Sequence, residues 1–149
     1  MARKKRVAPD VIRLDRFLPY KVAQLSDRLL IKNAQLAAGG YKLTTQEWKA
    51  LAIIADSGPM TPADIRRHST QDKSTISWAL KRLMRCGILI KTPWKDDART
   101  FQVSLSTAGW AYYRLIVPQA RALERASFKA LTRAELQTFR RLVNKLVGR

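Results

Sequence analysis

The sequence predicts a mainly α-helical fold with one small β-hairpin. Through most of the 149 residues, apolar side chains recur every three to four positions, in stretches bounded by helix-capping residues and glycines. One stretch, residues 88–105, instead has strand-like runs on either side of a turn-like centre, and its second run alternates apolar and polar residues. With 46% hydrophobic and 27% charged residues, the chain has enough apolar side chains to bury one core.

The first helix is predicted over residues 14–38, after a basic arm at residues 1–13. It carries an apolar stripe with helical spacing, made of Leu18, Val22, Leu25 and Leu29. Gly39 and Gly40 are expected to end this helix, because glycine favours helix C-termini.

Three short helices are predicted next. Thr44 and Glu47 have the spacing of a capping box, in which each side chain accepts a hydrogen bond from the other residue's backbone N–H. Thr61 is expected to cap a third helix, and Asp72 a fourth helix that ends at Cys86.

The following stretch predicts two strands, at residues 88–92 and 100–105, joined by turn residues 93–99. Three short helices followed by such a hairpin have the order of a winged helix-turn-helix head, which we assign to residues 44–105. In a helix-turn-helix, the second helix of the pair lies in the major groove of DNA.

The C-terminal part predicts two more helices. A long one starts at Ser106 or Thr107 and runs to about Leu131, and Pro118 should kink it. The closing helix has its own capping box and apolar stripe, comprising Thr132 and Glu135, then Leu136, Phe139, Val143 and Leu146.

Two parts of the chain thus carry apolar stripes outside the compact head. These stripes need a partner surface that buries them. We therefore expect residues 14–43 and 106–149 to form a helical dimerisation region.

The chain is strongly basic, with 29 Lys and Arg against 11 Asp and Glu and a formal net charge of +18. A polyanion is the natural partner of such a protein. One cysteine and one histidine exclude an internal disulfide and a Cys/His zinc cluster, so we expect no metal, no cofactor and no enzyme activity. No apolar run approaches the ~20 residues of a membrane span, and the expected location is the cytoplasm.

The predicted fourth helix has two distinct faces at roughly 100° per residue. Ile76, Leu80 and Leu83 point to one side, which predicts contact with the core. The opposite side contains no carboxylate and comprises Ser74, Trp78, Lys81 and Arg85, flanked by Ser77 and Arg82. Hydroxyl and cationic side chains read base edges and phosphates in the major groove, so this face predicts DNA binding. The alternative is a solvated surface helix with incidental basic residues.

The turn of the hairpin is the second candidate contact. It holds Lys95, Asp97 and Arg99. An arginine at a wing tip can enter the narrow, electronegative minor groove, and a carboxylate two residues away can hold its guanidinium bidentately. The alternative is an ordinary surface ion pair between Asp97 and Arg99, which stabilises little.

Several motifs occur in the order and spacing of one known family. These are Asp72-Lys73-Ser74-Thr75-Ile76-Ser77, the Leu83-x-x-x-Gly87 ending, Asp97-x-Arg99, Leu105-Ser106-x-x-Gly109, the Glu47-Trp48 pair and the proline at 118. Over about residues 14–147 the chain resembles the MarR-type winged helix-turn-helix transcriptional regulators. The resemblance implies a bacterial homodimer that binds double-stranded DNA at an inverted-repeat operator and regulates transcription, most often as a repressor.

The resemblance also implies roles for individual residues. Ser74, Thr75, Ser77 and Lys81 match base- and phosphate-reading positions, and Lys73 matches a backbone contact. Arg99 matches the minor-groove residue of the wing, and Asp97 the carboxylate that orients it.

Trp78 departs from the pattern, because relatives usually carry arginine at this position. Tryptophan cannot donate bidentately to guanine. It can pack on a thymine methyl, contribute shape alone, or pack against a neighbouring subunit or the wing.

Many relatives bind a small aromatic or phenolic effector between the head and the dimer helices. Arg28, Trp48 and Trp110 are our candidates for lining such a crevice, although tryptophans at helical spacing are also common in plain cores. Cys86 has no second cysteine in the chain with which to form a redox pair. The rival interpretation of the whole sequence is a nonspecific basic architectural DNA- or RNA-binding protein.

Overall fold

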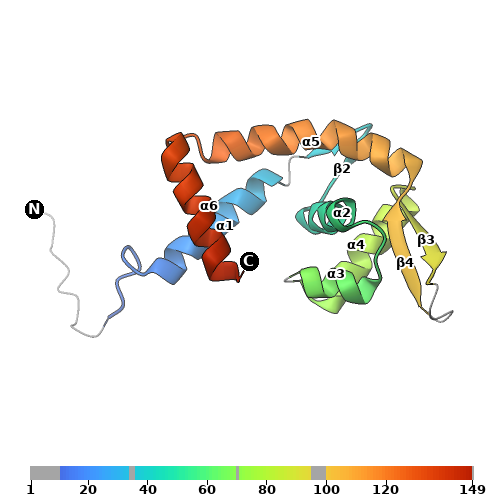
Figure 1. Ribbon diagram of the computed structural model, residues 1–149, viewed down its shortest axis with the longest axis horizontal. Coiled ribbons are helices and arrows are strands. Elements are labelled where there is room, and N and C mark those ends of the chain that lie inside the picture. The colour runs from blue at the N-terminus through green and yellow to red at the C-terminus, as the bar shows by residue number, and fades with distance from the viewer. Residues whose placement is uncertain (1–10, 34–35, 70, 95–99, 149) are drawn as a thin grey trace, which may run out of the picture.

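A computed structural model describes residues 11–33, 36–69, 71–94 and 100–148. It has a head and a helical extension, and the long helix α5 runs from one to the other (Figure 1). The elements in chain order are α1 (Leu18–Asn33), β1 (Ala37–Ala38), β2 (Tyr41–Lys42), α2 (Thr45–Ser57), α3 (Pro62–His68), α4 (Lys73–Arg85), β3 (Leu89–Pro93), β4 (Phe101–Leu105), α5 (Thr107–Ser127) and α6 (Arg133–Val147). The prediction of a mainly helical winged helix-turn-helix fold is confirmed.

The core lies where α2, α3, α4 and the β3–β4 hairpin meet. Its fully buried side chains include Leu51, Ile54, Ile65, Ile76, Leu83, Leu89 and Val103. The side of α4 predicted to face inward is the buried one. Burial of such side chains is the main stabilising term of a domain this size.

The predicted caps are present at the helix starts. The Thr44 and Thr132 hydroxyls accept from the backbone N–H groups of Glu47 and Glu135, and each glutamate accepts from its threonine's N–H in return. Thr61 forms a third capping box, with an aspartate as the reciprocal acceptor. These contacts satisfy N–H groups that the first turn of a helix leaves unpaired.

The hairpin is antiparallel, with Leu89 paired to Leu105 and Pro93 to Phe101. It is joined to the head by a third chain segment, because Met60 exchanges two backbone hydrogen bonds with Val103, at 3.1 and 2.9 Å. This pairing fixes the direction in which the hairpin leaves the head (Figure 1).

The predicted helix over residues 14–38 is wrong at both ends. The described helix α1 is shorter, and Gly39 and Gly40 form the turn between strands β1 and β2 with φ of 54° and 77°. Two-residue strands leave no alternation to read in a sequence. They exist here because α5 holds them: the Tyr112 hydroxyl donates to Tyr41 O, and Gln119 Nε2 donates to Ala37 O.

Helix α5 continues through Pro118 and ends at Ser127, four residues before the predicted end. A short turn follows, in which the Leu131 N–H donates to Phe128 O. Within the described ranges, no helix is long and apolar enough to cross a membrane.

The helical extension leaves much apolar surface uncovered. Helices α1 and α6 both lie on the side of the molecule away from the head (Figure 1). Leu18 is 69% exposed and Leu146 is 85% exposed. Other large exposed side chains in this part are Val11, Ile12, Leu14, Phe17, Val22, Leu142, Val143 and Val147.

Candidate nucleic-acid interface

The outward face of α4 is exposed, as its sequence predicts. The exposed side chains on it are Lys73, Ser74, Ser77, Trp78, Lys81 and Arg85, and Thr75 is half-buried. The helix therefore presents hydroxyls, cations and one indole to solvent, on the side away from the core.

Asp72 organises the first turn of this helix. Its carboxylate accepts from the Thr75 N–H at 2.9 Å, from the Thr75 hydroxyl at 2.6 Å, and from the Ser74 hydroxyl. The Ser74 and Thr75 side-chain bonds, in that order, hold the pKa of the Asp72 carboxyl well below its usual range. Since both hydroxyls donate to Asp72, their oxygens remain free to accept hydrogen bonds from base amino groups.

An ion pair between a buried carboxylate and a partly exposed guanidinium joins α4 to α2. The Glu47 side chain is 0% exposed, and its Oε1 lies 3.0 Å from Arg82 Nε. The guanidinium carbon of Arg82 lies 5.0 Å from the centre of the Trp78 ring. From the sequence, Glu47 was expected to cap a helix and Arg82 to face DNA. The ion pair between them was not predicted, because the spacing of a capping box does not show which side chain packs against the glutamate.

Cations also surround a hollow of about 380 Å³ between α3, α4 and the hairpin. Its apolar wall includes Ile76, Leu80, Met84 and Phe101, and its cations are Arg66, Lys73, Lys81 and Lys91. The Lys91 ammonium lies 4.0 Å from the centre of the Phe101 ring. Sequence reasoning missed Arg66 and Lys91, which only the tertiary fold brings beside α4.

Three predicted DNA contacts, Lys95, Asp97 and Arg99, lie outside the described residues. The strands β3 and β4 that lead to them are described, and they lie at one edge of the head (Figure 1). The basic arm falls largely in residues 1–10, which are also outside the described ranges.

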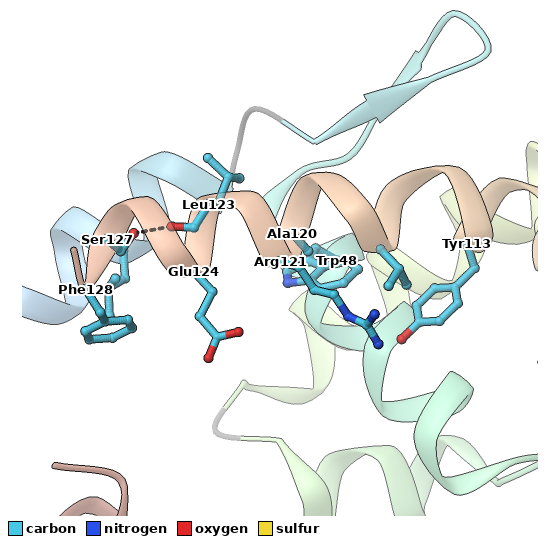
Figure 2. Close-up of a pocket in the computed structure, with 10 residues that line it drawn as sticks. Trp48, Tyr113, Ala120, Arg121, Leu123, Glu124, Ser127 and Phe128 are labelled. Atoms are coloured by element: carbon cyan, nitrogen blue, oxygen red, sulfur yellow. Dashed lines mark hydrogen bonds between the residues drawn. The ribbon is translucent and has the colours of Figure 1, made fainter. Parts of the chain in front are cut away.

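A separate cavity of about 430 Å³ lies beneath α5. It is lined by Leu29, Trp48, Tyr113, Val117, Ala120, Arg121, Leu123, Glu124, Ser127 and Phe128. The Trp48 and Tyr113 rings stack, with centroids 6.3 Å apart and an interplanar angle of 18°. Tyr113, Arg121 and Glu124 extend from the same side of α5 (Figure 2).

Of the three predicted crevice residues, Trp48 alone lines this cavity. Trp110 does not line the cavity. Its ring contacts the Tyr113 ring in a T-shaped arrangement, with centroids 5.9 Å apart. Arg28 is exposed on α1 and does not line the cavity, whereas Arg121 does. The sequence does not identify Arg121 as a cavity residue, because which side chains of α5 line the cavity depends on how α5 packs over α2.

The single cysteine, Cys86, and the single histidine, His68, belong to no cluster of potential metal ligands within the described parts of the chain. The cysteine is exposed at the C-terminal cap of α4, and no cluster of three potential metal ligands occurs among the described residues.

Comparison with known proteins agrees with this geometry. Residues 43–101 match the model of the MarR family. A crystal structure of a probable transcriptional regulator from Pseudomonas aeruginosa is 30% identical, covers 90% of this chain and 99% of its own, and superposes with a TM-score of 0.80.

Two curated repressors are also similar. The HTH-type transcriptional repressor IacR of Pseudomonas putida is 26% identical over 136 residues, which are 91% of this chain and 81% of IacR. The homoprotocatechuate degradative operon repressor of Escherichia coli is 23% identical over 108 residues, which are 72% of this chain and 73% of that repressor. The chain has a recognition helix of this form with a hairpin beside it, and two of these relatives match it over at least 90% of its length. It belongs to the MarR family of transcriptional regulators.

Proposed function

We propose that this protein is a homodimeric repressor that binds an inverted-repeat operator in double-stranded DNA and is released by a small aromatic acid. The outward face of α4 carries the first part of this proposal. It offers two oriented hydroxyl acceptors, Ser74 and Thr75, beside the cations Lys73 and Lys81. This combination suits base edges and phosphates in one major groove.

The dimer is supported by the uncovered apolar side chains of α1 and α6. A second copy would bury both stripes across a two-fold axis, which is the commonest symmetry of soluble oligomers. Residues 14–43 and 106–149 would then form the dimer region, and each 44–105 head would meet one half-site. Heads about 34 Å apart would reach successive major grooves.

The wing keeps its proposed role. Arg99 would enter the minor groove next to the half-site, with Asp97 holding its guanidinium and Lys95 on a phosphate. Support for this comes from the described β3–β4 strands, which form an antiparallel pair at the edge of the head.

The cavity beneath α5 supports an effector of defined chemistry. Stacked Trp48 and Tyr113 suit a planar ring, and Arg121 suits a carboxylate on that ring. A related repressor is named for an operon that degrades homoprotocatechuate, an aromatic acid. Because the cavity is lined by the head helix α2 and by α5, a bound ligand would favour one spacing of the two heads over another.

Repression by occupancy requires no bond-making chemistry. We propose accordingly that this chain is not an enzyme, as MarR-family regulators in general are non-enzymatic transcription factors.

Fluorescence anisotropy with operator DNA tests the first part. The operator is first selected from random duplexes with the protein, and its affinity is compared with that of a scrambled duplex at about 0.2 M salt. We expect a preference of roughly a thousandfold or more, saturating at one dimer per site. Equal, salt-sensitive binding to both duplexes would instead establish a nonspecific basic DNA- or RNA-binding protein.

The effector is tested by calorimetry with benzoate-type acids, comparing wild type with Arg121→Ala. Arg121→Ala should weaken binding of the acid while leaving operator affinity in the absence of acid unchanged. Arg28→Ala, which removes a cation outside the cavity, is the matched control. Equal loss in both variants would mean that the acid does not bind beneath α5.

A further inference from the structure

We propose that Trp78 reads a thymine methyl group, and that Arg82 is a positioning residue which holds the indole while Glu47 holds Arg82. This inference rests on the proposed function, because it concerns which base the α4 face selects. It assigns Arg82 to the protein interior side of the interface rather than to DNA.

Glu47 is the fixed end of this arrangement. Its carboxylate is fully buried and accepts from the Thr44 N–H at 2.7 Å and from the Tyr41 hydroxyl, besides its ion pair with Arg82. Both carboxylate oxygens are therefore engaged, Oε1 by Tyr41 and Arg82 and Oε2 by the Thr44 N–H. A buried charge of this kind holds its counterion firmly, since separating the pair would leave the charge unpaired.

Arg82 connects this fixed carboxylate to the surface. Its Nε is committed to Glu47, and its guanidinium carbon lies over the Trp78 ring, 5.0 Å from the ring centre. The side chain is 38% exposed, and its charge is matched by the buried carboxylate. Arg82 is therefore poorly placed to bind a phosphate, whereas Lys81 and Arg85 are exposed cations without an ion-pair partner among the described residues.

Trp78 is the outer end. It is 46% exposed on the side of α4 that faces away from the core. The indole separates a hollow lined by Gln46, Ser74 and Thr75 from a basic hollow lined by Lys81, Arg82, Arg85 and Cys86. A large apolar group thus lies between a hollow lined by hydroxyl groups and a hollow lined mostly by cations.

In a major groove, the Trp78 indole can distinguish bases mainly by apolar contact. The indole has a single donor, so it cannot make the bidentate bonds that identify guanine or adenine. The thymine C5-methyl is the one apolar feature among the base edges of that groove. Burying one methyl group changes affinity by about fourfold.

Replacement of single thymines by deoxyuridine tests this reading, because uracil lacks only the methyl group. In the selected operator, we expect one symmetry-related thymine pair whose replacement weakens wild-type binding by about fourfold per half-site. Trp78→Ala, an exposed substitution, should abolish the effect at that pair and preserve any methyl effect elsewhere. Unchanged sensitivity of Trp78→Ala at every thymine would overturn the proposal.

Arg82→Lys tests the positioning role. Lysine keeps a cation for Glu47 but lacks the flat group that lies over Trp78. We expect a smaller methyl effect at the Trp78 pair with no change in the dependence of log K on log salt. Lys81→Met is the matched control: because it removes one cation that binds a phosphate, it should lower the salt slope by about one per subunit and leave the methyl effect intact.

The outcomes separate the two proposals. An Arg82→Met variant, which removes the charge, tests the alternative: if it lowers the salt slope as Lys81→Met does, Arg82 contacts a phosphate and the positioning role is overturned. Wild-type protein without operator preference would overturn the proposed function as well. Operator preference without any methyl effect would overturn only the reading by Trp78.

Discussion

Glu47 and Glu135 occupy the same position of the same capping motif and have different surroundings. Both accept the backbone N–H of the threonine three residues earlier, at 2.7 Å. Glu47 is also buried against Arg82 and Tyr41, whereas Glu135 is exposed at the end of the molecule. Glu135 therefore only caps its helix, whereas Glu47 caps α2 and also joins α2 to α4 through Arg82.

Replacing Glu47 or Glu135 by alanine should lower the free energy of unfolding by different amounts. Glu135→Ala removes one cap and should lower the free energy of unfolding by about 1 kcal/mol. Glu47→Ala also leaves the Arg82 charge unmatched and a void in the core, so the free energy of unfolding should fall by about 3 kcal/mol or more. Urea unfolding followed by circular dichroism measures both. Equal losses would mean that the Arg82 pair adds nothing to stability.

Asp72 predicts a pH dependence at the single-residue scale. Hydrogen bonds from Ser74 and Thr75 lower the pKa of its carboxyl below the ordinary value of 3.8 in the folded protein. The ionised group thus contributes stability that is fully present above about pH 4 and is lost as the pH falls toward the lowered pKa.

Asp72→Ser keeps a neutral cap that does not titrate. The difference in urea midpoint between wild type and Asp72→Ser should be constant from about pH 7 to about pH 5 and should shrink below about pH 4. A difference that stays constant down to about pH 2.5 would contradict the assigned cause.

At the scale of elements, α5 is the structural link between the head and the extension. Its first turn sits directly on the chain that leaves α4: the Ser106 hydroxyl donates to Gly87 O and accepts from the Gly109 N–H. A Cβ added at Gly109 would lie 2.0 Å from the backbone oxygen of Ile88. Glycine is needed here for close approach, because any other side chain would separate α5 from β3.

Gly109→Ala should therefore destabilise the protein by at least about 3 kcal/mol, at the upper end of overpacking substitutions. The exposed neighbour provides a control, since Ala108→Ser should change stability by less than about 0.5 kcal/mol. Thermal unfolding of both variants is the measurement. A Gly109→Ala protein as stable as wild type would show that α5 can shift without cost.

At the scale of the whole molecule, the head and the extension differ in how much apolar surface they bury. The head has its own buried core, while α6 has no buried residue in the described chain. Helices α5 and α6 are joined by the Arg140–Glu124 ion pair at 2.7 Å and by Phe128 against Phe139. These contacts set the angle of α6 and leave its apolar stripe facing outward.

Leu146→Glu should disrupt the proposed dimer. A charge in the middle of a buried apolar interface is unpaired and costs several kcal/mol. Analytical ultracentrifugation at micromolar concentration should show a monomer, with loss of tight operator binding. Gln137→Glu adds the same charge to α6 outside the stripe and should remain a dimer. A dimeric Leu146→Glu protein would place the interface elsewhere.

Much of this protein follows from local sequence. Caps at Thr44, Thr61, Asp72 and Thr132 fix where the helices begin, because a cap needs only residues within one turn. The helical period fixed which side of α4 is buried and which is outward. The motifs around Asp72 and Gly109 identified the family.

The tertiary structure decided what depends on residues distant in sequence. The β1–β2 turn depends on Tyr112 and Gln119 of α5, which lie 71 and 82 positions from their partners Tyr41 and Ala37. The cation beneath α5 is Arg121 rather than Arg28, because the crossing of α5 over α2 determines which side chains share a cavity. Arg82 pairs with Glu47 for the same reason. Which side chains are buried and paired depends on three-dimensional packing, and this cannot be inferred from the spacing of residues along one helix.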